Sequence, residues 1–85
     1  MKEFDHIIKD PNGIHARPAG FLVQELQKFE STARIFKGDA SCDGKKLFGL
    51  LKLSVKTNEK ITVQIEGEDE DAACNAAKAF LEANM

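Results

Sequence analysis

Hydrophobic residues near the start of the chain alternate with polar ones, as expected for a strand with one buried face. Phe4, His6 and Ile8 fall on one side of residues 2–9, and the turn-forming residues 10–13 follow. We therefore predict a strand over residues 2–9 that ends at a turn. Because His6 shares its face with two apolar side chains, we assign it a structural role.

Two later segments have the three- and four-residue spacing of amphipathic helices. The first follows the turn, with Gly20, Gln24 and Lys28 mostly on its polar side. Its apolar side carries Ala19, Leu22, Val23, Leu26 and Phe29. The second, residues 69–83, has an apolar stripe and begins with acidic residues, which suit the positive N-terminal end of a helix macrodipole.

The middle of the chain predicts three shorter elements. Residues 32–43 alternate around a turn at residues 38–39, which indicates a hairpin. The dense apolar cluster at residues 47–53 suits a short helix, and residues 61–66 show the most regular strand alternation. The resulting order, β-α-β-β-α-β-α, predicts an α+β fold with antiparallel strands and the helices on one face of the sheet.

Length and composition limit what this chain can do. With 85 residues and 42% apolar content, we expect residues 1–85 to form a single domain with little room for a deep cavity, so chemistry should occur at the surface. Twelve basic and fourteen acidic residues, without Trp or Tyr, argue against nucleic acid as a partner. No run of about 18 apolar residues is present, so we expect no membrane insertion and a cytoplasmic location.

The two cysteines give no sign of a metal or redox site. Cys42 and Cys74 are far apart and lack the spacing of either kind of motif. We expect free thiols rather than a redox pair, and we expect neither a metal nor a cofactor.

Residues 12–19 place a histidine where a turn becomes a helix. Pro18 fits the first helical turn, which puts His15 at or beside the N-cap. Unpaired N–H groups of Ala16 and Arg17 and the helix macrodipole would then favour an anion beside a nucleophilic imidazole. The pattern alone leaves a second interpretation open, in which His15 is an ordinary polar residue and Arg17 a solvated charge.

The sequence Gly-Ile-His-Ala-Arg-Pro-Ala at residues 13–19 resembles the active-site signature of HPr, the histidine-containing phosphocarrier of the bacterial phosphoenolpyruvate-dependent sugar phosphotransferase system. The resemblance extends over essentially the whole chain, including its length, its order of elements and residues 22–24, 47–48 and 67–69. It implies an open-faced β-sandwich, in which a four-stranded antiparallel sheet is covered on one face by three helices.

The resemblance also implies how the chain would act. His15 would be phosphorylated by enzyme I through Nδ1 and would pass the group to the A domains of sugar-specific permeases. Arg17 would steady the phosphoryl group, the N–H groups of Ala16 and Arg17 would help to bind it, and Pro18 would hold the helix start in shape. We expect a monomer with a phosphohistidine intermediate rather than a stand-alone enzyme.

A second group of residues is expected to contact partners. Leu47, Phe48 and Leu51 can share one side of the short helix, while Leu50 and Leu53 turn toward the core. Core packing is the alternative for each of the first three residues. By resemblance to HPr, we expect them to form an apolar docking surface together with Gly20.

Position 46 departs from the family pattern. The chain has Lys46 where the family usually has a serine, which in many firmicute relatives is the target of a regulatory kinase. A lysine cannot form that phosphate ester, so regulation through this position is in doubt. Lys46 leaves open an HPr-like regulatory paralogue in nitrogen or single-sugar signalling. A further alternative is an adaptor that only binds partners, although an adaptor has no need of a nucleophile at position 15 flanked by Arg17.

Overall fold

The computed structural model describes all 85 residues and contains four strands and three helices in the predicted order. The elements are β1 (Lys2–Ile7), α1 (Ala16–Gln27), β2 (Thr32–Lys37), β3 (Ala40–Asp43), α2 (Leu47–Lys52), β4 (Lys60–Glu66) and α3 (Glu70–Asn84). The predicted α+β class and β-α-β-β-α-β-α order are confirmed. No helix is long and apolar enough to cross a membrane.

The strands form one antiparallel sheet in the order β1-β4-β2-β3. Strand β4 lies inside the sheet and pairs with β1 and β2. The alternation of apolar and polar residues that predicted this strand corresponds to its two faces. Ile61, Val63 and Ile65 are buried, whereas the residues between them are partly exposed. The predicted hairpin is confirmed, since β2 and β3 pair directly across the turn at residues 38–39.

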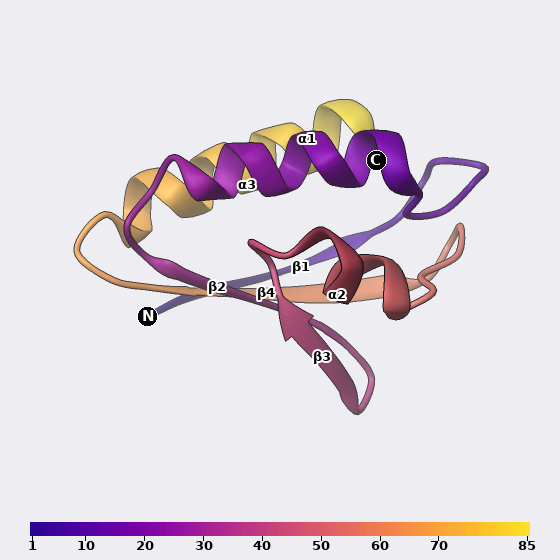
Figure 1. The fold of residues 1–85 in the computed structure, drawn as a ribbon, viewed down its shortest axis with the longest axis horizontal. Helices are drawn as coiled ribbons and strands as arrows, with labels where there is room; N and C mark the ends of the chain where they lie inside the picture. Colours follow the sequence, from indigo (N-terminus) through magenta and orange to yellow (C-terminus); the bar gives the residue numbers. More distant parts are fainter.

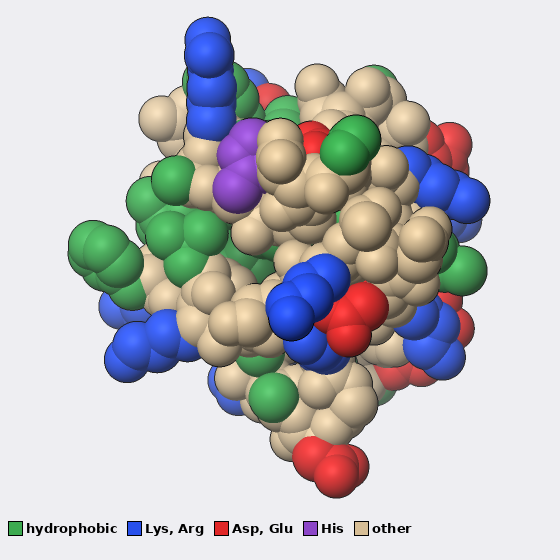
Figure 2. All heavy atoms as spheres, turned by 90° about the vertical axis from the view of Figure 1, so that its right-hand side faces the viewer, with side chains coloured by type: hydrophobic (Ala, Val, Ile, Leu, Met, Phe, Trp, Pro, Cys, Tyr) green, Lys and Arg blue, Asp and Glu red, His purple; other side chains and the backbone are tan.

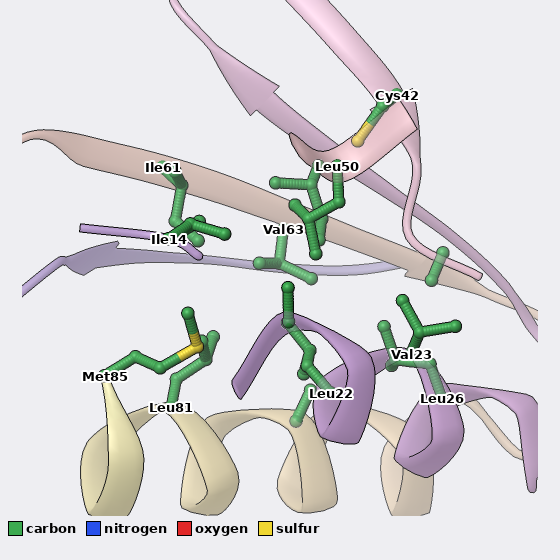
Figure 3. Close-up of a cluster of buried hydrophobic side chains, with 14 of the residues drawn as sticks. Ile14, Leu22, Val23, Leu26, Cys42, Leu50, Ile61, Val63, Leu81 and Met85 are labelled. Atoms are coloured by element: carbon green, nitrogen blue, oxygen red, sulfur yellow. The ribbon is translucent and has the colours of Figure 1, made fainter. Parts of the chain in front are cut away.

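All three helices lie on one face of the sheet, with α1 and α3 side by side and α2 close to β3 (Figure 1). The core fills the space between these layers (Figure 3). Leu22 and Leu26 from α1, Leu50 from α2 and Leu81 from α3 point into it and are almost completely buried. This layering brings the start of α1 and the short helix α2 to the same end of the molecule.

Two element boundaries differ from the predictions by two residues, and the others agree to within one. The first strand ends at Ile7 because the pairing with β4 stops there, and the N–H groups of Lys9 and Asp10 turn instead to the carbonyl of Met85. Phe29 lies beyond the end of α1, although it still packs against the core as predicted from its spacing.

The structure also agrees with the expectations for His6, for Leu50 and Leu53, and for the two cysteines. His6 lies half-buried on β1, and its Nε2 is buried without a hydrogen-bond partner, so it offers no accessible site. Leu50 and Leu53 turn into the core. Cys42 is buried and Cys74 is partly buried, and both are free thiols. Burial raises the pKa of the Cys42 thiol, which disfavours the reactive thiolate.

Candidate functional site

A tight turn fixes the approach of the chain to α1. The N–H of Gly13 donates to the carbonyl of Asp10 at 2.9 Å, and the N–H of Ile14 donates to the carbonyl of Val55 at 2.9 Å. Gly13 has a φ of +68°, and a Cβ there would lie 2.3 Å from the Val55 oxygen. Only glycine fits this position, so the turn that precedes His15 is tied firmly to the loop before β4.

His15 is the N-cap residue of α1, as predicted. Its backbone is extended and its carbonyl accepts the N–H of Ala19 at 3.0 Å. The imidazole does not cap the helix, and 39% of the side chain is exposed. The N–H groups of Ala16 and Arg17 have no acceptor within the chain, and Pro18 has no N–H group. The start of the helix can therefore bind an anion from outside the chain.

The side chain of Arg17 is exposed and takes part in no ion pair or hydrogen bond. Its guanidinium is therefore available to a phosphoryl group, which it can hold through two parallel hydrogen bonds. Figure 2 shows a histidine at the surface with hydrophobic side chains beside it and a Lys or Arg side chain above it.

One contact at the site was not predicted from the sequence. Asp10 Oδ2 lies 3.3 Å from Nε2 of His15, and Asp10 Oδ1 accepts the N–H of Asn12 at 2.8 Å. The Asn12 N–H is the main cause of the lowered pKa of Asp10, and His15 contributes in the same direction. The sequence signal was the turn itself, in which an aspartate commonly accepts the N–H two residues later.

The predicted docking residues differ in exposure. Phe48 on α2 is 79% exposed, whereas Leu47 and Leu51 are half-buried and pack against the core. Gly20 lies on α1 with nothing within 4 Å of the place where a Cβ would be, so the surface above it is open. Phe21, one position further along α1, was not among the predicted docking residues and is 53% exposed.

Lys46 is the N-cap residue of α2, and its side chain makes no capping hydrogen bond. A surface groove of about 780 Å³ lies between β3 and α2, lined in part by Lys46, Phe48 and Lys52. This groove does not include His15 and therefore belongs to the α2 side of the molecule rather than to the acceptor.

A sheet with three helices on one face and an accessible histidine at the N-cap of α1 defines a class of small α+β proteins, and comparisons with known proteins assign the family. The family model described as "PTS HPr component phosphorylation site" matches residues 2–83. The chain belongs to the HPr family. Its function is that of an HPr phosphocarrier in the phosphotransferase system.

Individual relatives agree with this assignment over their full lengths. The phosphocarrier protein HPr of Mycoplasma genitalium is 42% identical and covers 99% of this chain and 97% of its own. The HPr of Buchnera aphidicola is 40% identical over 95% of both chains. The crystal structure of a Thermoanaerobacter tengcongensis HPr superposes with a TM-score of 0.93 at 34% identity, covering 98% of this chain and 93% of its own.

Proposed function

We propose that His15 accepts a phosphoryl group from phosphorylated enzyme I through Nδ1 and passes it to the A domains of sugar-specific permeases. One observation carries this proposal: an accessible imidazole at the N-cap of α1, next to two free backbone N–H groups. Enzyme I and the permease A domains are the partners expected of the HPr family.

The geometry explains how transfer would be favoured. The phosphoryl group develops negative charge on its oxygens, and the start of α1 offers the N–H groups of Ala16 and Arg17 together with about half a positive charge from the macrodipole. The Arg17 guanidinium adds a full charge from the solvent side. Pro18 stabilises the first turn without requiring an acceptor, so the anion site exists before the group arrives.

Partner binding is assigned to the surface beside His15. Gly20, Leu47, Phe48 and Leu51 would form the apolar docking surface, with Phe48 as its most exposed member. An exposed aromatic side chain of this size supplies much of the binding energy when a partner removes it from water. Because no side chain covers Gly20, a partner could approach the backbone of α1 closely at this position.

The decisive experiment uses phosphoenolpyruvate, Mg²⁺ and enzyme I, with intact mass as the readout. The natural chain should gain one phosphoryl group that acid removes, since phosphoramidates are labile in acid. His15→Ala should fold normally and gain none. Full acid-labile labelling of His15→Ala would refute the assignment.

Variants of Arg17 test its separate role. Arg17→Ala should slow acceptance without abolishing it, because the nucleophile remains. Arg17→Lys keeps the charge but loses the planar fork, so it should recover only part of the rate. An Arg17→Ala rate equal to that of the natural chain would show that Arg17 does not contact the group.

One observation favours a second candidate, a regulatory paralogue of the same family that serves nitrogen or single-sugar signalling. Lys46 occupies the position of the regulatory serine. The two candidates differ in the acceptor downstream of His15, so the labelled chain should be offered to sugar-specific A domains. Rapid transfer of the label to such a domain would support a carrier role in sugar uptake. For this role we also infer that the chain is a monomer in the cytoplasm.

A further inference from the structure

The loop that leads into α1 uses both oxygens of one carboxylate. Asp10 Oδ1 accepts the N–H of Asn12 at 2.8 Å, and Asp10 Oδ2 lies 3.3 Å from His15 Nε2. The side chain of Asp10 is 19% exposed, so it is more sheltered than the imidazole. Its carbonyl also accepts the N–H of Gly13 at 2.9 Å, which fixes the backbone from which the carboxylate extends.

The chemistry of this contact favours one ring nitrogen of His15 as the site of the proton. An ionised carboxylate accepts hydrogen bonds and donates none, so the nitrogen that faces Asp10 must be the protonated one. A neutral imidazole has a single N–H, and when it is on Nε2 the lone pair is on Nδ1. The lowered pKa of Asp10 keeps its carboxylate ionised at neutral pH.

We propose that Asp10 is a positioning residue whose carboxylate holds the proton on Nε2 of His15 and thereby presents the Nδ1 lone pair to the incoming phosphoryl group. This inference rests on the proposed function of His15 and names the residue that prepares it. Asp10 does not touch the phosphoryl group, because it lies on the Nε2 side of the ring.

The transfer step gives the same carboxylate a second effect. The Nδ1 lone pair forms a bond to phosphorus while the bond from phosphorus to the donor breaks and its electron pair stays with the donor. His15 keeps its Nε2 proton, so the phosphorylated ring carries a positive charge. Asp10 faces that charge and stabilises it, as the aspartate of a serine-protease triad stabilises its imidazolium. The contact should shorten at this stage, because hydrogen bonds between charged partners are shorter.

Two substitutions separate this role from a structural one. In Asp10→Asn the amide oxygen can still accept the N–H of Asn12, which turns the amide NH₂ toward His15. That NH₂ group donates to Nε2 and favours the proton on Nδ1, where it blocks the lone pair. In Asp10→Ala both hydrogen bonds are lost, so the loop loosens but neither tautomer is enforced. A positioning role makes Asp10→Asn the slower acceptor, whereas a structural role makes Asp10→Ala the slower one.

The tautomer can be measured directly from the ¹⁵N chemical shifts of the His15 ring in the full labelled chain. The spectra are recorded at a pH of about 8. We expect the Nε2–H form to dominate in the natural chain, the Nδ1–H form in Asp10→Asn and a mixture in Asp10→Ala. Asp39→Asn, in the exposed turn between β2 and β3, is the matched control and should leave the tautomer unchanged.

Single-turnover acceptance from phosphorylated enzyme I should follow these populations. A rate roughly ten-fold lower is expected for Asp10→Asn and about two- to three-fold lower for Asp10→Ala, since the rate scales with the fraction of competent molecules. Three results would each overturn the proposal: an Nδ1–H ring in the natural chain, an unchanged tautomer in Asp10→Asn, or acceptance by Asp10→Ala that is slower than acceptance by Asp10→Asn. The tautomer measurement needs no donor, so it is independent of the proposed function, which fails instead if the natural chain gains no acid-labile label.

Discussion

Replacing Lys46 by serine should stabilise the chain, and the structure allows the gain to be divided into two parts. Lys46 already has the extended backbone of an N-cap, with φ −123° and ψ 116°, but its side chain offers no acceptor. At this end of α2 the Lys46 carbonyl accepts the N–H of Leu50 at 3.1 Å, and the Lys46 N–H donates to the carbonyl of Asp43 at 3.1 Å, outside the helix. A serine hydroxyl could accept the N–H of Phe48 or Gly49, which typically stabilises a protein by about 1 kcal/mol.

The second part is electrostatic. The Lys46 ammonium lies at the positive end of α2, and its removal should contribute about 0.3 kcal/mol, the lower end of the usual range, because α2 has only six residues. Neighbouring Lys45 adds little to this repulsion, since its Nζ donates to the carbonyl of Phe29 at 2.7 Å, beyond the end of α1. The expected total is roughly 1–1.5 kcal/mol, or a Tm higher by about 4–10 °C.

Lys46→Ala separates the two parts, because it removes the charge without supplying a cap. Urea and thermal unfolding of the three forms should be compared at low salt and at about 1 M salt, where screening removes the electrostatic part. We expect Lys46→Ser to remain more stable than Lys46→Ala at both salt concentrations. Equal stability of these two variants would show that no hydroxyl cap forms. In addition, an HPr kinase with ATP should give acid-stable label on Lys46→Ser and none on the natural chain.

Three further predictions concern the docking surface and the fold. Phe48→Asp should weaken binding to enzyme I at least about ten-fold in titration calorimetry with little change in Tm, because Phe48 is already exposed in the free chain; early melting with normal binding would place it in the core. Gly20→Ala should raise stability by about 0.5–1 kcal/mol in urea unfolding, since the site is open and glycine weakens a helix; a loss would reveal an unseen contact. The pKa of Asp69 is lowered by the hydroxyl of Ser31 and then by nearby N–H groups, so its contribution is present above a pH of about 4 and is lost as the pH falls through the folded-state pKa. The Tm of Asp69→Asn should therefore fall less steeply with acid than that of the natural chain, and parallel curves would contradict this linkage.

Asp69 illustrates what local sequence could not supply. Its position before an apolar stripe correctly predicted the start of α3, where it is the N-cap residue. Its carboxylate does not cap α3, however, but accepts the N–H groups of Glu30 and Ser31 and the Ser31 hydroxyl in the segment before β2. Gly67 packs closely against the same segment, since a Cβ at this position would lie 2.5 Å from the Ser31 hydroxyl oxygen. Partners nearly forty positions apart leave no periodic signal.

The docking surface shows the same limit on a smaller scale. Helical spacing placed Leu47, Phe48 and Leu51 on one side of α2, but only the packed structure decided that Phe48 is largely exposed and the two leucines are half-buried. Spacing within a helix fixes relative direction, whereas exposure depends on how the helix is rotated against the sheet. Phe21, by contrast, had a signal in the sequence, since its neighbours three and four positions later are Gln24 and Glu25 and it therefore falls outside the apolar stripe of α1.

The sequence by itself determined the elements, most of the core-facing residues and the place of His15 at the start of α1, because these follow from periodicity and from the turn and proline that flank the histidine. Tertiary structure alone decided how His15 is held. Val55 anchors the preceding turn from a loop some forty residues later, and the resulting loop conformation brings Asp10 to Nε2 of the imidazole. Such contacts depend on chain segments that meet only after folding, so local propensity contains no record of them.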